Sequence, residues 1–133
     1  MEMIAATALV AGTLAPALAV MRDAMAVSRE ASRRNLLTIY AVQGLEYAAG
    51  ITMQNWATGT STGNYASEGH PTIRYVVTRS DDPASGGITG KLMHVQVTTF
   101  DDANGNSALD AGEQSVRFRT KVAKLLTYQN EPN

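Results

Sequence analysis

The chain of 133 residues contains no cysteine, and its two histidines and four prolines are few. The absence of cysteine excludes a disulfide framework, a thiolate metal site and a cysteine nucleophile. Two histidines fall short of the several nitrogen or sulfur ligands of a typical zinc site. The sequence also lacks a glycine-rich phosphate loop, a serine-hydrolase elbow and a metalloprotease helix. We therefore expect a protein that is not an enzyme.

Charge is scarce as well. The chain carries 11 Lys and Arg against 12 Asp and Glu, a formal net charge of −1. No basic stripe of the kind that binds nucleic acid is present. The hydrophobic share of 44% and the length indicate one folded domain rather than a disordered chain. The charges are unevenly placed, since Glu2 is the only charged residue before Arg22.

An uncharged run extends from Met3 to Met21. As a helix its 19 residues span roughly 28 Å at ~1.5 Å per residue, close to the ~30 Å of a bilayer core. It can be read as a cleaved secretory signal, as a buried core helix or as a retained membrane anchor. The acid at position 2 disfavours the signal, which needs a basic start, and the length disfavours the core helix. We favour an anchor over 1–21, followed by a soluble domain over 22–133.

Helical character continues beyond the apolar run. No proline interrupts the chain between Pro16 and Pro71. Apolar residues recur at helical spacing and form one stripe, made of Leu37, Ala41, Leu45, Ala48 and Ile51. We therefore predict one helix from about Ile4 to about Gln54, apolar in its first half and amphipathic in its second.

The C-terminal half predicts strands over Thr72–Arg79, Leu92–Phe100 and Ser115–Leu125, where β-branched and alternating apolar residues gather. Thr58–Pro71, rich in Gly, Ser, Thr and Asn, is predicted as a loop. Three sequential strands with short connections form an antiparallel meander. The expected fold is α+β, with the amphipathic half of the helix on one sheet face and Trp56 filling their interface.

The segment 102–113 between the last two strands is the most specific pattern in the sequence. Oxygen-bearing side chains stand at loop positions 1, 3, 5, 9 and 12, the spacing of a calcium loop. The candidate Ca²⁺ ligands are Asp102, Asn104, Asn106, the Ala108 carbonyl, Asp110 and Glu113. Ser107 replaces the glycine of the EF-hand, the flanks are strands, and Leu109 is expected to hold the loop to the core. The alternative is a polar turn that binds nothing.

The first residues resemble a known family. Type IV pilins and the pseudopilins of type II secretion open with Gly-Phe-Thr-Leu-Ile/Leu-Glu, followed directly by an apolar helix of this length. Met1-Glu2-Met3-Ile4-Ala5-Ala6 is similar to the end of that signature, with Glu2 at the family's glutamate. Pro16 resembles the helix-kinking proline of these anchors. The basic leader, the cleavage-site glycine and the phenylalanine of the family are not in this chain.

This resemblance implies a subunit of a type IV pilus-like or type II secretion pseudopilus filament. It implies a single-pass protein of the inner membrane, an extracytoplasmic C-terminal domain (periplasm or cell-surface filament) and other pilin-like subunits as partners. It assigns Glu2 to assembly, where the carboxylate neutralises a neighbour's N-terminal amine in an apolar core.

Two alternatives remain open. The positive-inside rule would place the arginines from Arg22 to Arg34 on the cytoplasmic side, whereas the pilin family places this segment outside. A second hypothesis for the function is a single-span membrane protein whose calcium-binding extracytoplasmic module binds a partner and never polymerises.

Overall fold

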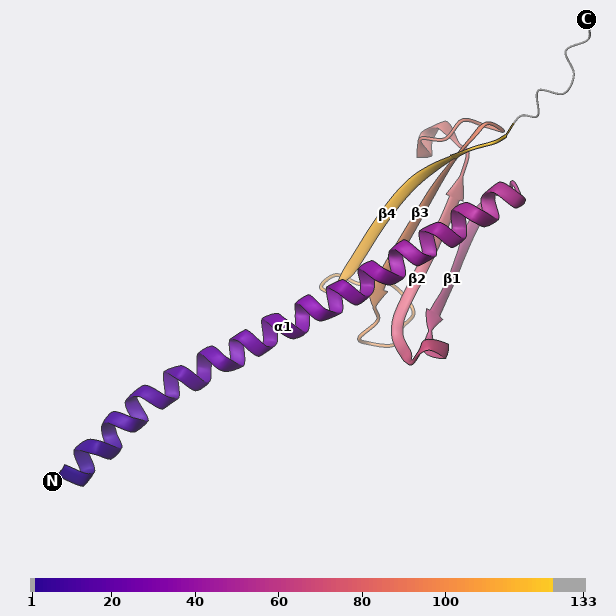
Figure 1. Ribbon diagram of the computed structural model, residues 1–133. Coiled ribbons are helices and arrows are strands. Elements are labelled where there is room, and N and C mark those ends of the chain that lie inside the picture. Colours follow the sequence, from indigo (N-terminus) through magenta and orange to yellow (C-terminus); the bar gives the residue numbers. More distant parts are fainter. Residues whose placement is uncertain (1, 126–133) are drawn as a thin grey trace, which may run out of the picture. The chain divides into compact units, whose positions relative to one another are not determined.

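The computed structural model describes residues 2–125. They form α1 (Glu2–Gln54), β1 (Gly59–Tyr65), η1 (Ala66–Glu68), β2 (His70–Ser80), η2 (Pro83–Ser85), β3 (Leu92–Asp101) and β4 (Ser115–Ala123), where η is a 3-10 helix. The strands make one antiparallel sheet in the order β1-β2-β3-β4 (Figure 1). The predicted α+β fold and the meander of β2, β3 and β4 are confirmed.

The prediction of a loop over 58–71 is wrong, because β1 lies inside it and β2 begins before its end. β1 reads GTSTGNY and buries only its last residue. Its place in the sheet comes from backbone pairing with β2, for example Thr60 with Thr78 and Asn64 with Arg74. A strand held by its backbone leaves little trace in the apolar pattern of the sequence.

The chain divides into two compact units after Asn35, inside α1 and beyond the end of the apolar run at Met21. In the N-terminal unit every described residue from Glu2 to Asn35 is exposed. α1 carries acid in its first turn and continues through Pro16. The C-terminal unit holds the rest of α1, the sheet and the hydrophobic core.

The core of the C-terminal unit forms where α1 lies across one face of the sheet. The predicted helical stripe supplies Leu37, Ala41 and Ala48, all buried. The sheet supplies alternate residues of β3, namely Met93, Val95, Val97 and Thr99, each 0% exposed. Trp56 packs partly buried against this core, as predicted.

Two buried hydrogen bonds join the helix to the sheet. The Thr99 hydroxyl donates to the Leu37 carbonyl at 2.8 Å, and the Tyr65 hydroxyl donates to the Tyr40 carbonyl at 3.3 Å. The rings of Tyr40 and Tyr65 stack with centroids 3.9 Å apart. These contacts hold the start of the C-terminal unit's helical segment against β1 and β3.

Candidate functional site

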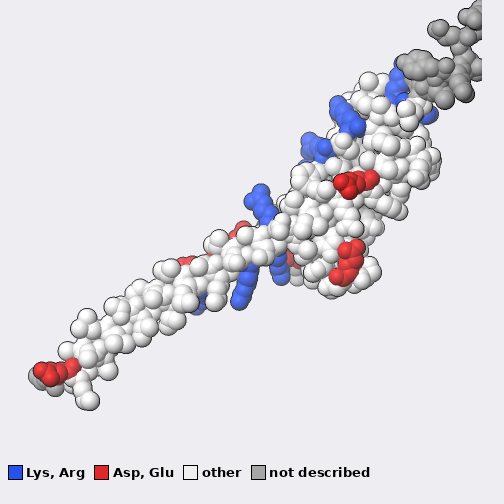
Figure 2. Space-filling model, viewed as in Figure 1, with Lys and Arg blue, Asp and Glu red and all other residues white. Residues whose placement is uncertain are grey.

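The apolar surface of the N-terminal unit is the first candidate site. Its large apolar side chains between positions 3 and 21 are 52–86% exposed. They are Met3, Ile4, Leu9, Val10, Leu14, Leu18, Val20 and Met21. α1 is long and apolar enough to cross a membrane, by length and composition. Figure 2 shows the surface between Glu2 and the first arginine free of charged side chains.

The polar groups of this surface are largely satisfied within the helix. The Thr7 hydroxyl donates to the Met3 carbonyl at 2.8 Å, and the Thr13 hydroxyl donates to the Leu9 carbonyl at 3.1 Å. Such back-bonding removes the cost of bringing a bare hydroxyl into an apolar surrounding. Pro16 has no amide hydrogen, so one carbonyl a turn earlier lacks its helical donor.

The loop between β3 and β4 is the second candidate site, and Asp110 organises it. Oδ2 of Asp110 accepts hydrogen bonds from the side-chain amides of Asn104, at 2.7 Å, and Asn106, at 2.5 Å. The Oδ1 atoms of the same two asparagines accept the backbone amides of Asn106 and Ala108, at 3.0 and 2.8 Å. The side chains of three of the six predicted ligand residues therefore meet directly, with the amide nitrogens of the asparagines facing Asp110.

Glu113 closes the loop from its far end. Oε1 accepts the Ala103 amide and Oε2 accepts the Asp110 amide, each at 3.0 Å. Where the loop meets the sheet, the Asp101 amide donates to the Gln114 carbonyl at 3.0 Å. Both carboxylate oxygens of Glu113 thus hold backbone amides of the loop they end.

Asp102 has other hydrogen-bond partners than these residues. It is 3% exposed, and its Oδ2 accepts the Ser107 amide at 3.0 Å and an ion-pair hydrogen bond from Nε of Arg74 on β2. Burial alone would raise the pKa of Asp102, but the Ser107 amide, the hydrogen bond from Arg74 and its charge outweigh burial and lower the pKa. Its Oδ1 is buried and has no hydrogen-bond partner among the described residues.

The fit of this loop to a hard cation is partial. Within residues 2–125 no three His, Asp or Glu side chains are gathered closely enough to hold a metal ion. Ser107 adopts φ 68°, the left-handed conformation that glycine provides at position 6 of a calcium loop. Oδ1 of Asp102 is a buried acceptor without a hydrogen-bond donor among the described residues, although Arg74 already pairs with Oδ2 of the same carboxylate. Leu109 is 38% exposed, so it does not anchor the loop as expected.

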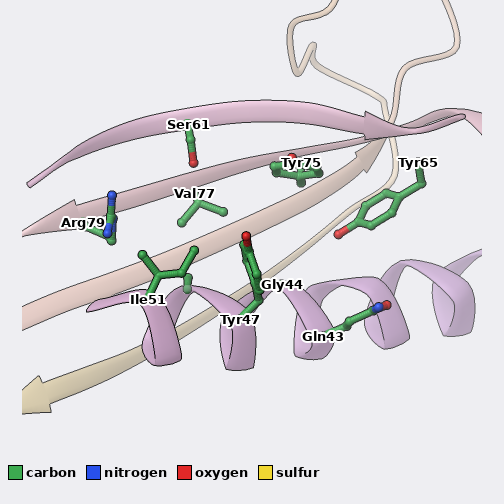
Figure 3. Close-up of a pocket in the computed structure, with 10 residues that line it drawn as sticks. Gln43, Gly44, Tyr47, Ile51, Ser61, Tyr65, Tyr75, Val77 and Arg79 are labelled. Atoms are coloured by element: carbon green, nitrogen blue, oxygen red, sulfur yellow. The ribbon is translucent and has the colours of Figure 1, made fainter. Parts of the chain in front are cut away.

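Sequence reasoning missed a third feature, an apolar groove between β1 and α1. The groove measures about 290 Å³ and lies within the C-terminal unit. Figure 3 shows Arg79 toward one end and Tyr65 toward the other, with Gly44 and Val77 between them. Because the groove depends on β1, which the apolar pattern does not reveal, no signal in the sequence pointed to it.

No family model, no curated protein and no solved structure matches this chain. The similarity to pilins therefore stays a prediction, made from the residues around Glu2 and from the apolar run with Pro16.

Proposed function

We propose that this protein is a membrane-anchored structural subunit of a pilus-like filament, of the type IV pilus or type II secretion pseudopilus kind. One observation carries the proposal. A single helix has a fully exposed apolar half in one compact unit, and continues into a second unit where it packs on an antiparallel sheet. The apolar half of the helix is suited to contact with lipid, and the folded C-terminal unit is suited to contact with water.

The exposed surface is too apolar to remain in water. Burying one such side chain fully is worth ~1.5–3 kcal/mol, so eight of them represent at most about 12–24 kcal/mol. That is as large as the whole stability of a typical domain, ~5–15 kcal/mol. Lipid covers this surface before assembly, and the same helices of neighbouring subunits cover it in the filament.

Glu2 has the assembly role in this proposal. It is the only charged side chain before Arg22 and lies in the first turn of α1. A carboxylate in an apolar surrounding is costly unless an opposite charge meets it. The N-terminal amine of a neighbouring subunit supplies that charge and fixes the axial register between two helices.

Calcium binding by the loop 102–113 is part of the same proposal. The ligands would be Asp102, Asn104, Asn106, the Ala108 carbonyl, Asp110 and Glu113. The left-handed Ser107 and the orphaned Oδ1 of Asp102 support it. The asparagine amides that converge on Asp110 occupy the side of that carboxylate where a cation would be attracted. Bound Ca²⁺ would stiffen the connection between β3 and β4 in a domain exposed outside the membrane.

Cysteine cross-linking in the native host's membranes tests the filament role, because the chain has no cysteine of its own. Leu9→Cys places one thiol on the exposed apolar surface, and Ser85→Cys places a control thiol in η2. Because each chain then has one thiol and can join only one other chain, helix-to-helix packing predicts rapid formation of a disulfide-linked dimer for Leu9→Cys and none for the control. Adding Glu2→Gln should reduce the yield of this dimer severalfold while leaving the C-terminal unit folded.

The non-polymerising alternative gives a different result. A single-span protein surrounded by lipid alone would form no more disulfide-linked dimer with Leu9→Cys than with Ser85→Cys. Dimer formation that Glu2→Gln leaves unchanged would support helix packing but reject the assembly role of Glu2.

A further inference from the structure

The two edges of the sheet differ in chemistry. β4, one edge, carries Arg117, Arg119 and Lys121 at exposed positions. Figure 2 shows Lys and Arg side chains along this side of the sheet. β1, the other edge, has neither a charged residue nor proline in its sequence GTSTGNY. Charges and proline are the usual protection of an edge against strand addition, so β1 is the receptive edge.

The groove beside β1 exists because this strand directs almost no side chain toward α1. Successive residues of a strand point to opposite faces. Ser61 pairs with Val77 and Gly63 pairs with Tyr75, whose side chains lie on the α1 side. A Cβ on Gly63 would lie 2.4 Å from the Tyr75 hydroxyl, so the ring occupies the room that a side chain would need. The remaining space forms the groove.

The groove has an aromatic end and a cationic end. Tyr65 and Tyr75, with ring centroids 5.3 Å apart, stand at one end, and Arg79 stands at the other. The four steps along β2 from Tyr75 to Arg79 span about 13 Å at ~3.3 Å per residue. Nη1 of Arg79 is buried and has no acceptor among the described residues. A buried guanidinium nitrogen without an acceptor is costly, and a carboxylate is its best partner.

We propose that this groove binds an extended peptide segment of a partner protein. The segment adds to the free edge of β1 through backbone hydrogen bonds and places alternate apolar side chains between β1 and α1. One carboxylate of the segment pairs with Arg79. This is the strand-addition mode of recognition, in which the backbone gives affinity and pockets for alternate side chains give specificity. The site lies wholly in the C-terminal unit and does not depend on the filament role.

Two pools of labelled peptides test this proposal on the full chain in lipid nanodiscs, which avoid detergent in the groove. Each fluorescein-labelled, C-terminally amidated heptapeptide alternates Thr with Val, Leu, Ile or Phe. One pool ends in Glu and the matched pool ends in Gln. Fluorescence anisotropy should show saturable binding of the Glu pool below about 1 mM, and at least tenfold weaker binding of the Gln pool.

Two variants with matched controls locate the site. Ser61→Trp fills the groove and should abolish binding, whereas Thr60→Trp puts the same ring on the other face of β1 and should leave binding unchanged. Arg79→Met should weaken the Glu pool about tenfold and remove its advantage over the Gln pool. Arg119→Met removes a cation from the β4 edge and should change neither pool.

Several results would overturn the proposal. They are no binding of either pool to the wild-type chain, equal binding to Ser61→Trp, or an advantage of the Glu pool that survives in Arg79→Met. Self-association in nanodiscs that Ser61→Trp abolishes, without peptide binding, would assign the groove to a second copy instead. Circular dichroism melts establish that each variant is folded. Should Ser61→Trp not fold, Arg79→Met with the two pools decides.

Discussion

At the scale of single residues, one buried carboxylate joins the loop 102–113 to the sheet. Asp102 accepts the Ser107 amide within the loop and the Arg74 guanidinium from β2. The pattern of oxygen ligands in the sequence identified Asp102 but not Arg74, which lies 28 residues earlier. An ion pair between distant segments follows from the strand register, and the sequence contains no local sign of it.

We expect the pair of Arg74 and Asp102 to stabilise the fold in a pH-dependent way. A carboxyl whose pKa is lower in the fold stabilises it above the ordinary pKa of 3.8, and the contribution disappears as pH falls through the folded-state pKa. A double-mutant cycle of Arg74→Met and Asp102→Asn, followed by thermal unfolding, should show favourable coupling at neutral pH. The coupling should vanish in strong acid. Equal coupling at both pH values would contradict this assignment.

The calcium proposal predicts that the ion stabilises the wild-type chain through linkage. A ligand at a hundred times its dissociation constant adds about 2.7 kcal/mol to the free energy of unfolding. The melting temperature should therefore rise with Ca²⁺, and Asp110→Ala and Glu113→Ala should lose most of that rise. Glu46→Ala removes a carboxylate from α1 and serves as the control. No heat in a calorimetric titration and no shift in melting temperature would reject the site.

At the scale of elements, α1 and the strands β2, β3 and β4 were predictable because each buries one face against the other. Leu37, Ala41 and Ala48 repeat with the period of a helix, and Val95 and Val97 repeat with the period of a strand. β1 has no such repeat, since Gly59, Ser61 and Gly63 place no bulk on the α1 side. The groove beside β1 exists for the same reason, so apolar periodicity could predict neither β1 nor the groove.

Two glycines of α1 provide a matched test of the helix–sheet interface. A Cβ on Gly44 would lie 3.3 Å from Cγ1 of Val97, whereas one on Gly50 meets no atom within 4 Å. Alanine in a helix interior is favoured over glycine by ~0.5–1 kcal/mol. Gly50→Ala should therefore raise the free energy of unfolding by that amount. Gly44→Ala should forfeit the gain and fall about 1–2 kcal/mol below Gly50→Ala because of overpacking.

Chemical denaturation of the two glycine variants under one set of conditions makes this comparison. Equal stabilisation by both substitutions would mean that the Val97 side chain moves aside for the added methyl group without a cost in free energy. The close approach of α1 to β3 at Gly44 would then have no energetic role.

At the scale of the whole molecule, the two compact units have surfaces suited to different surroundings. From Met3 to Met21 the N-terminal unit exposes an uncharged and mostly apolar helix surface, while the C-terminal unit buries its own core under α1. The uncharged run from Met3 to Met21 predicted this contrast, because its length and composition are those of a membrane span. Covering that helix is the physical requirement on which the proposed membrane anchor and the proposed filament assembly rest.

Sedimentation velocity of the full chain, purified without detergent or lipid, tests this requirement most directly. Exposed apolar helices should associate, so the account predicts large, polydisperse particles that become single subunits when lipid nanodiscs are supplied. A homogeneous species of 14.2 kDa in plain buffer would mean that the chain is a stable, soluble monomer in water. The membrane anchor and the filament subunit would both be contradicted by that result.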